Sequence, residues 1–250
     1  MQDKKDTWGI PRPGEISPEG LSGLRPPARL PHGHPIFIGI CGGTCSGKTS
    51  LATQFYQLLG EERVNIISQD NYYKGWSHLT PEERARINFD NPEALETGLL
   101  VEHLSTLRRN QKVSIPQYDF KNHARHPKSQ EIVPRAFTIV EGILLFHDPK
   151  LRETLDLRIY LDVSFNTMLR RRTERDVRER GRTAESVRNQ FLSTVYPMHL
   201  EFVEPYKRHA HLVIQEETSL VARAALVTKA AERLIQEITR IQARTPGDKA

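Results

Sequence analysis

A short glycine-rich segment holds the residues best suited to binding phosphate. Residues 42–49 read GGTCSGKT and match the phosphate-loop pattern G-x-x-x-x-G-K-[ST]. Glycines let successive backbone N–H groups curve around an anion, because a residue without a Cβ tolerates the backbone angles that this requires. Lys48 would neutralise the β- and γ-phosphates of a nucleotide, and Thr49 would offer its hydroxyl to Mg²⁺. The predicted nucleotide-binding residues of this phosphate loop and the helical turn after it are Gly42, Gly43, Thr44, Cys45, Ser46, Gly47, Lys48, Thr49 and Ser50.

The chain on either side of the phosphate loop supports this interpretation. Residues 36–40 form a short apolar run typical of a strand, and apolar residues recur at helical spacing over residues 49–59. A strand, a glycine loop and a helix therefore follow one another in the order that a phosphate site requires. The positive end of the helix would add to the attraction for an anion.

Three acidic residues each follow a run typical of a buried strand: Asp70, Glu141 and Asp162. In open α/β sheets, ligands bind beyond the carboxyl ends of the strands, so these positions are where chemistry is expected. Asp70 has the placement of a base that accepts a proton from an attacking hydroxyl. If Asp70 stood alone, a cap or turn aspartate would be the better interpretation. Glu141 is predicted to hold Mg²⁺ or its waters, with Asp162 as the competing candidate.

An arginine-rich segment follows at residues 170–182, where seven arginines stand against Glu174, Asp176 and Glu179. Such a segment could close over a nucleotide as a lid that spreads positive charge and excludes water. The alternative is a solvated helix face with pairs such as Glu174 with Arg178. The net charge of +5 and the pI of about 9.2 could suggest nucleic acid, but much of the excess sits in this one segment. No nucleic-acid partner is therefore predicted.

Composition bounds the class of protein. A chain of 250 residues can bury a full core, and its length favours one α/β domain with appendages. No apolar run reaches the length of a membrane span, and the N-terminus lacks the apolar core of a signal peptide. The two cysteines, Cys41 and Cys45, exclude a secreted disulfide scaffold. We therefore expect a soluble, cytoplasmic protein without a membrane partner.

Strands alternate with helices along the chain, which predicts a parallel sheet with right-handed crossovers. Residues 1–34 contain six prolines and five glycines and are predicted to be a disordered arm. Strands are predicted at 36–40, 64–68, 113–118, 131–133, 137–140, 157–161 and 212–214, and helices at 49–59, 92–109, 165–180, 184–205 and 220–241. The predicted domain covers 35–242, with a lid at about 170–184 and a flexible tail at 243–250.

Further motifs occur in a fixed order after the phosphate loop. They lie at residues 39–49, 68–74, 88–92, 118–125, 141–144 and 172–182, with 197–205 as an additional stretch. With these motifs the sequence resembles the uridine kinase (uridine/cytidine kinase) family, in its bacterial form, over nearly all of residues 35–240. The resemblance implies a P-loop NTPase (NMP-kinase-like) three-layer sandwich: a mainly parallel central sheet with a small β-hairpin insertion and a helical lid.

The resemblance also implies roles for individual residues. Asp70 would be the general base for a nucleoside 5′-hydroxyl, acting with Lys48 and Arg175. Asp90 and Arg172 would hold the ribose hydroxyls, with Tyr73 and Gln190 nearby. Around the base, Tyr118 and His123 would read the pyrimidine edge, and Phe89 and Phe120 would pack against the ring. The lid residues Arg175, Arg180 and Arg182 would contact the phosphates and the base side.

The activity implied is transfer of the γ-phosphoryl of ATP or GTP to uridine or cytidine, with Mg²⁺ held by Thr49 and Glu141, in a homotetramer. The guanine-reading N-K-x-D motif of GTPases is absent from the sequence. Two alternatives stay open. One is a related kinase of the phosphoribulokinase or pantothenate kinase type. The other is a non-catalytic pyrimidine-sensing protein that binds RNA, which is supported only by the basic pI.

Overall fold

The computed structural model describes residues 35–76, 78–84, 87–120 and 122–216, together with the single positions 218, 222, 226 and 229. Three predictions concern residues outside this part of the chain. They are the arm at 1–34, the tail at 243–250 and nearly all of the helix at 220–241.

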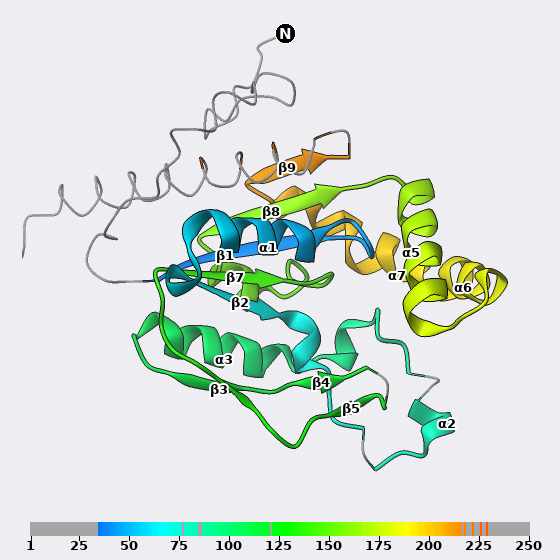
Figure 1. The fold of residues 1–250 in the computed structure, drawn as a ribbon, viewed down its shortest axis with the longest axis horizontal. Helices are drawn as coiled ribbons and strands as arrows, with labels where there is room; N and C mark the ends of the chain where they lie inside the picture. The colour runs from blue at the N-terminus through cyan, green and yellow to red at the C-terminus, as the bar shows by residue number, and fades with distance from the viewer. Residues whose placement is uncertain are drawn as a thin grey trace, which may run out of the picture.

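A five-stranded sheet with every pairing parallel forms the centre of the molecule (Figure 1). Its strands, in spatial order, are β2 (Val64–Ser68), β7 (Phe137–Glu141), β1 (Ile36–Gly42), β8 (Leu157–Asp162) and β9 (Leu212–Gln215). All seven residues of the central strand β1 are buried, as expected when both faces of a parallel sheet are covered. The carboxyl ends of β2, β7, β1 and β8 therefore meet at one edge of the sheet.

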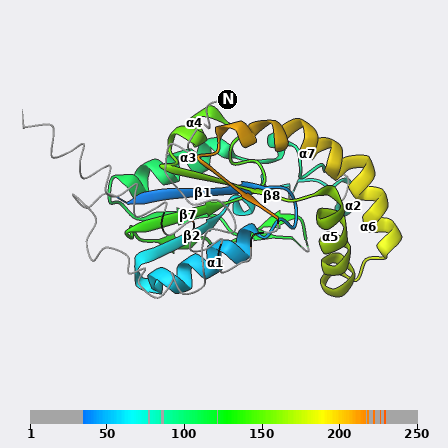
Figure 2. The same ribbon diagram turned by 90° about the horizontal axis from the view of Figure 1, so that it is seen from above.

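Helices cover both faces of this sheet. Helix α1 (Lys48–Leu59) lies on one face, while α3 (Thr97–Arg108), α4 (Pro149–Glu153) and α7 (Tyr196–Phe202) lie on the other (Figure 2). Side chains of β1 alternate between the two layers of core: Ile38 packs in the cluster with Phe55 of α1, and Phe37 in the cluster with Leu104 of α3. The predicted three-layer sandwich is confirmed.

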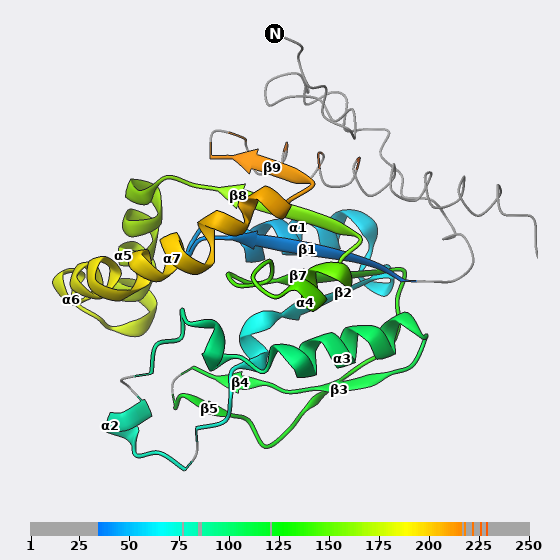
Figure 3. The same ribbon diagram turned by 180° about the vertical axis from the view of Figure 1, so that it is seen from behind.

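Two short antiparallel pairs form the predicted insertion, beside α3 (Figure 3). Strand β3 (Val113–Ile115) pairs with β6 (Gln130–Ile132), and β4 (Tyr118–Asp119) pairs with β5 (Ala124–Arg125). The single strand predicted at 113–118 is thus two strands. Pro116 separates them, because proline has no N–H to donate to a ladder.

The arginine-rich helix α5 (Phe165–Arg180) has the predicted bounds. The hydroxyl of Ser164 caps its N-terminus, and Gly181, at φ 63°, ends it in the left-handed region that favours glycine. The helix predicted at 184–205 is instead divided into α6 (Ala184–Gln190), a π-helical turn (Phe191–Val195), α7 and a 3₁₀ segment (Glu204–His209).

One other helix prediction needs correction, and short helices were missed. The helix predicted from residue 92 starts at Thr97, because a bridge between Tyr73 and Leu95 and the bond from Glu96 N–H to the Tyr72 carbonyl (2.8 Å) keep Leu95 and Glu96 out of the helix. Helix α4 was not predicted, since five residues are too few to show a period. The remaining elements are 3₁₀ turns at Glu61–Arg63, Gln69–Tyr72 and Pro92–Ala94, and the four-residue helix α2 (Pro81–Arg84). Every helix in the described part of the chain is too short or too polar to cross a bilayer.

Candidate active site

The phosphate loop leaves β1 and enters α1 through backbone angles that only special residues adopt. Gly42 (φ 147°) and Gly47 (φ 98°) have positive φ, and so does Cys45 (φ 56°). A Cβ on Gly42 would lie 2.6 Å from the carbonyl oxygen of Leu161, so no other residue fits there. The loop is a compact turn whose N–H groups and helix terminus can surround an anion.

Lys48 lies at the start of α1 with its side chain folded over the loop. Its ammonium group donates to the carbonyls of Gly42 (3.0 Å) and Gly43 (2.8 Å), and the residue is only 8% exposed. A buried positive charge is thereby held at the mouth of the phosphate loop. This is where the β- and γ-phosphates of a bound nucleotide would need it.

A carboxylate and two hydroxyls meet at the ends of two neighbouring strands. Glu141, the last residue of β7, accepts hydrogen bonds from Ser68 Oγ (2.7 Å) and Thr49 Oγ1 (3.4 Å). Sequence reasoning missed Ser68, because only the register of β2 on β7 places it opposite Glu141. One carboxylate and hydroxyl oxygens fit Mg²⁺, which keeps several waters and shares the rest of its shell with phosphates.

The competing carboxylate Asp162 belongs elsewhere. It ends β8 and accepts a hydrogen bond from the ammonium group of Lys207. Of the two candidates, the structure therefore brings Glu141 next to Thr49. No cluster of three or more acidic, histidine or cysteine side chains suited to a metal occurs in the described residues.

Asp70 lies in the 3₁₀ turn that follows β2, facing the same edge of the sheet. Burial, together with the negative charge of Glu141, raises the pKa of Asp70 to about 6, and the positive charge of Lys48 opposes this. The turn is held by Gln69, whose side-chain oxygen accepts from Leu144 N–H (3.0 Å). Close packing of Gln69 leaves no room for a Cβ on Gly142. A carboxylate with a pKa near neutrality is suited to general base catalysis.

Five residues from three distant segments form an aromatic cluster beside Asp70: Tyr73, Phe89, Tyr118, Phe120 and His123. The ring of Tyr73 lies 5.1 Å from that of Phe89 and 5.3 Å from that of Tyr118. His123 stacks on Phe89, with centroids 5.0 Å apart, and Tyr118 contacts Phe120. Phe120 is 48% exposed, so it forms the rim of the aromatic cluster.

Two polar atoms of the aromatic cluster are buried without a hydrogen-bond partner within the part of the chain that the structure describes. They are Oη of Tyr118 and Nδ1 of His123. Burial, with help from the charge of Arg84, lowers the pKa of His123, so its ring is neutral at pH 7. Each unpaired buried polar atom costs about 1–3 kcal/mol. Because of this cost, such atoms in a folded protein often mark a place where a ligand binds.

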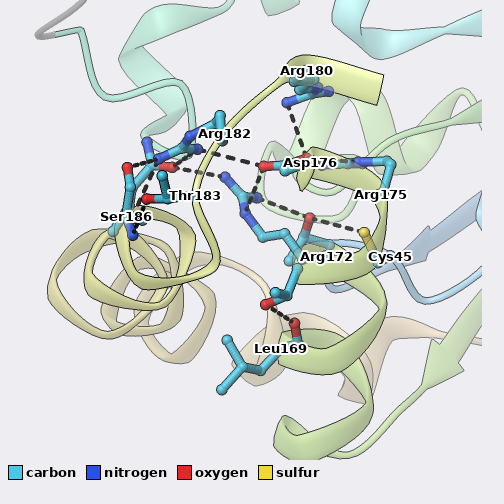
Figure 4. A network of polar contacts seen from close by, with 12 residues as sticks. Cys45, Leu169, Arg172, Arg175, Asp176, Arg180, Arg182, Thr183 and Ser186 are labelled. Carbon is cyan, nitrogen blue, oxygen red and sulfur yellow. Dashed lines mark hydrogen bonds and ion pairs between the residues drawn. The ribbon is translucent and has the colours of Figure 1, made fainter. Parts of the chain in front are cut away.

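The predicted lid arginines gather around one residue that sequence reasoning did not single out, Asp176 (Figure 4). Arg172, itself buried, donates to Thr44 Oγ1 of the phosphate loop (3.0 Å) and to Gln190 Oε1 (3.3 Å). Gln190 also accepts from Arg182 (2.6 Å). Arg171, likewise not predicted, reaches the Cys45 carbonyl at 3.5 Å.

Asp90 is a further acidic residue near Arg172. Burial raises the pKa of its carboxyl group, and the positive charge of Arg172 opposes this shift. The structure thus brings together the phosphate loop, Asp70, Glu141, Asp90 and the buried lid arginine. Some predicted site residues are exposed at the rim of this arrangement: Thr49, Ser50, Phe120, Arg180 and Gln190.

This arrangement of a phosphate loop, carboxylates beyond the ends of two strands and an arginine-rich helix is that of a phosphate-loop kinase. Residues 37–221 match the model of the phosphoribulokinase / uridine kinase family. The chain is 44% identical over 203 residues to a uridine kinase of Alkaliphilus metalliredigens, covering 81% of this chain and 98% of that protein. It is 48% identical over 180 residues to a uridine kinase of Chloroflexus aurantiacus, covering 72% and 86%.

Fold comparison agrees with the sequence comparison. Phosphoribulokinase from Rhodobacter spheroides superposes with a TM-score of 0.57 at 16% identity, over 73% of this chain and 70% of that one. At that identity the likeness concerns the fold alone. The protein belongs to the phosphoribulokinase / uridine kinase family.

Proposed function

We propose that this protein is a uridine/cytidine kinase, which transfers the γ-phosphoryl of ATP or GTP to the 5′-hydroxyl of uridine or cytidine and so yields UMP or CMP in pyrimidine salvage. One observation carries the proposal. The aromatic cluster holds two buried polar atoms, on Tyr118 and His123, that have no partner among the described residues. Its member Tyr73 donates its backbone N–H to the carbonyl of the candidate base Asp70 (3.3 Å). A flat heteroaromatic ring with polar edges fits such a place. The names of the relatives support the same substrate class.

Tyr118 and His123 are suited to reading either pyrimidine. A neutral imidazole has one nitrogen that donates and one that accepts, and the tautomer follows the partner. His123 would donate to O4 of uracil or accept from the N4 amino group of cytosine. Asp90 would accept from the ribose hydroxyls, with Arg172 and Gln190 beside it. Tyr73, whose hydroxyl donates to the Phe89 carbonyl (2.9 Å), would hold the pocket in shape.

Catalysis in this proposal rests mainly on positioning and charge. Asp70 would accept the proton of the 5′-hydroxyl as it attacks the γ-phosphoryl group. Lys48 and Arg175 would neutralise the phosphates, while Thr49 and Glu141 would hold Mg²⁺. The metal would supply charge stabilisation for the phosphoryl group and for the leaving nucleoside diphosphate, ADP or GDP.

The finer parts of the proposal concern assembly and location. The family resemblance supports a homotetramer acting in the cytoplasm, and the two thiols, Cys41 and Cys45, are both free. Light scattering coupled to size-exclusion chromatography tests the assembly directly. A monomer at micromolar concentration would contradict it.

The activity is tested by a coupled kinase assay across uridine, cytidine, adenosine, ribulose 5-phosphate and pantothenate. Phosphorylation of uridine and cytidine is expected. The variant His123→Phe keeps the stack on Phe89 but removes the polar edge, so we expect the KM for both pyrimidine nucleosides to rise about ten- to hundredfold with little change in the KM for ATP. His126→Phe, at an exposed position of the same insertion, is the matched control. Turnover of ribulose 5-phosphate or pantothenate alone would refute the proposal.

A further inference from the structure

The short helix α2 carries an arginine that contacts the loop on which His123 lies. Helix α2 ends at Arg84 and lies beyond the end of the β4–β5 pair (Figure 3). Nη1 of Arg84 donates to the backbone carbonyl of Asn122 (2.9 Å). Nε of Arg84 is buried and has no partner among the described residues. The bond to the Asn122 carbonyl is therefore what holds this side chain in place.

The carbonyl that Arg84 binds belongs to the peptide bond between Asn122 and His123. His123 has a positive φ of 49°, a conformation that costs energy in a residue with a Cβ and persists only where its neighbours hold it. Within the hairpin, the Asp119 carboxylate accepts from the backbone N–H (3.2 Å) and the side-chain amide (2.6 Å) of Asn122. Arg84 adds a bond from outside the hairpin. It therefore limits rotation of the peptide that sets the direction of the His123 ring.

Arg84 also connects to the segment that carries the ring on which His123 stacks. Its backbone carbonyl accepts from the N–H of Ile87 (3.2 Å), two residues before Phe89. The rings of Phe89 and His123 are 5.0 Å apart and nearly parallel, at 20°. One residue is thus bonded to the chain on both sides of this stack.

The charge of Arg84 acts on both side chains that were predicted to read the base. Burial raises the pKa of Tyr118 to about 12, and the charge of Arg84 opposes this shift. Burial lowers the pKa of His123, and the charges of Arg84 and Arg180 lower it further, against the opposing charge of Asp119. The guanidinium group of Arg84 therefore lies near the two side chains whose buried polar atoms lack a partner in the described part of the chain.

We propose that Arg84 is a positioning residue for recognition of the base. By holding the Asn122 carbonyl, it keeps the ring of His123 on Phe89 with its polar edge directed to the place of the pyrimidine. Without this bond the ring samples other orientations, and the cost of ordering it again reduces the affinity for the nucleoside. Arg84 acts through His123 and does not itself touch the substrate. The inference rests on the proposed function for the identity of the nucleoside.

Steady-state kinetics of Arg84→Met test the inference, because methionine keeps the apolar stem of arginine and removes its N–H groups. We expect the KM for uridine and cytidine to rise about three- to tenfold, less than in His123→Phe, while kcat and the KM for ATP stay within about twofold. Glu82→Gln, at an exposed position of the same short helix, is the matched control. It should keep the wild-type KM for both nucleosides.

The double variant separates positioning of His123 from a general structural role. If Arg84 acts through His123, adding Arg84→Met to His123→Phe should change the KM by less than about twofold. An unchanged KM in Arg84→Met, or the same fold-change in both backgrounds, would overturn the inference. If Arg84→Met does not fold, as judged by its thermal transition, Arg84→Gln takes its place under the same criteria. A failure of the proposed function shows separately, as wild-type protein that neither binds nor phosphorylates uridine.

Discussion

Replacing Asp70 with asparagine is expected to abolish most phosphoryl transfer and, at the same time, to stabilise the folded protein. The carboxylate is needed as a base, but its charge is held in a buried place next to Glu141. Asparagine has nearly the same shape and no charge, so it removes this repulsion and the desolvation cost. Nucleoside binding should survive, because the rest of the site is unchanged.

The size of the effect follows from the pKa. Folding raises the pKa of Asp70 from 3.8 to about 6. Between these values the folded protein binds more protons than the unfolded chain, so stability falls as the pH rises through that window. A pKa difference of about two corresponds to about 3 kcal/mol in the free energy of unfolding, and this stability is lost in full above pH 7. Asp70→Asn should therefore be more stable than wild type by up to about 3 kcal/mol at pH 7.5, and by about half that at pH 5.

Urea denaturation of both proteins at the two pH values measures this difference. Asp156→Asn is the contrasting control. The Asp156 carboxylate accepts from Phe37 N–H (2.8 Å) and pairs with Arg108 (3.0 Å), so losing its charge should reduce stability at pH 7.5. An Asp70→Asn protein that is no more stable than wild type at pH 7.5 would refute the inference that burial and the charge of Glu141 make the Asp70 carboxylate destabilising. Wild-type turnover would refute its role as the base.

Three further outcomes are expected. The kcat of the wild type should fall about tenfold per pH unit below about pH 6, as Asp70 becomes protonated, and a flat profile down to pH 5 would contradict this. Glu141→Gln should raise the Mg²⁺ concentration for half-maximal activity, measured by titration at fixed ATP; no change would assign the metal elsewhere. Gly43→Ala should lower the free energy of unfolding by about 1–3 kcal/mol, since its Cβ would lie 2.3 Å from Met168 Sδ. Gly98→Ala, with nothing within 4 Å, should instead raise it by up to about 1 kcal/mol, and urea denaturation of the two variants decides whether the signs differ.

Local patterns in the sequence were enough to predict the elements that carry the catalytic groups. The phosphate loop, the strands of the sheet and the lid helix depend on periodicity, glycine placement and caps, all of which act between near neighbours. The failures were at places where tertiary contacts override local preference. The helix predicted from Pro92 is one, because the bridge from Tyr73 to Leu95 keeps Leu95 extended, so the helix begins only at Thr97.

The site divides in the same way. The positions of Asp70 and Glu141 after buried runs pointed to the edge of a sheet, and a family resemblance supplied the aromatic residues. What no pattern indicated was the pairing of Ser68 with Glu141, which depends on strand register, and the burial of Asp176. In the sequence Asp176 is one acidic residue among seven arginines, indistinguishable from Glu174 or Glu179.

The sequence by itself thus determined the phosphate loop and the carboxylates at the strand ends, because each of these is encoded within a few consecutive residues. The order of strands and helices along the chain determined the class of fold. Only the tertiary structure decided which charges are buried, which polar atoms lack partners and which arginines share one carboxylate. These properties arise where segments far apart in the chain meet and water is excluded, so the energy of a charge there depends on neighbours that the local sequence does not contain.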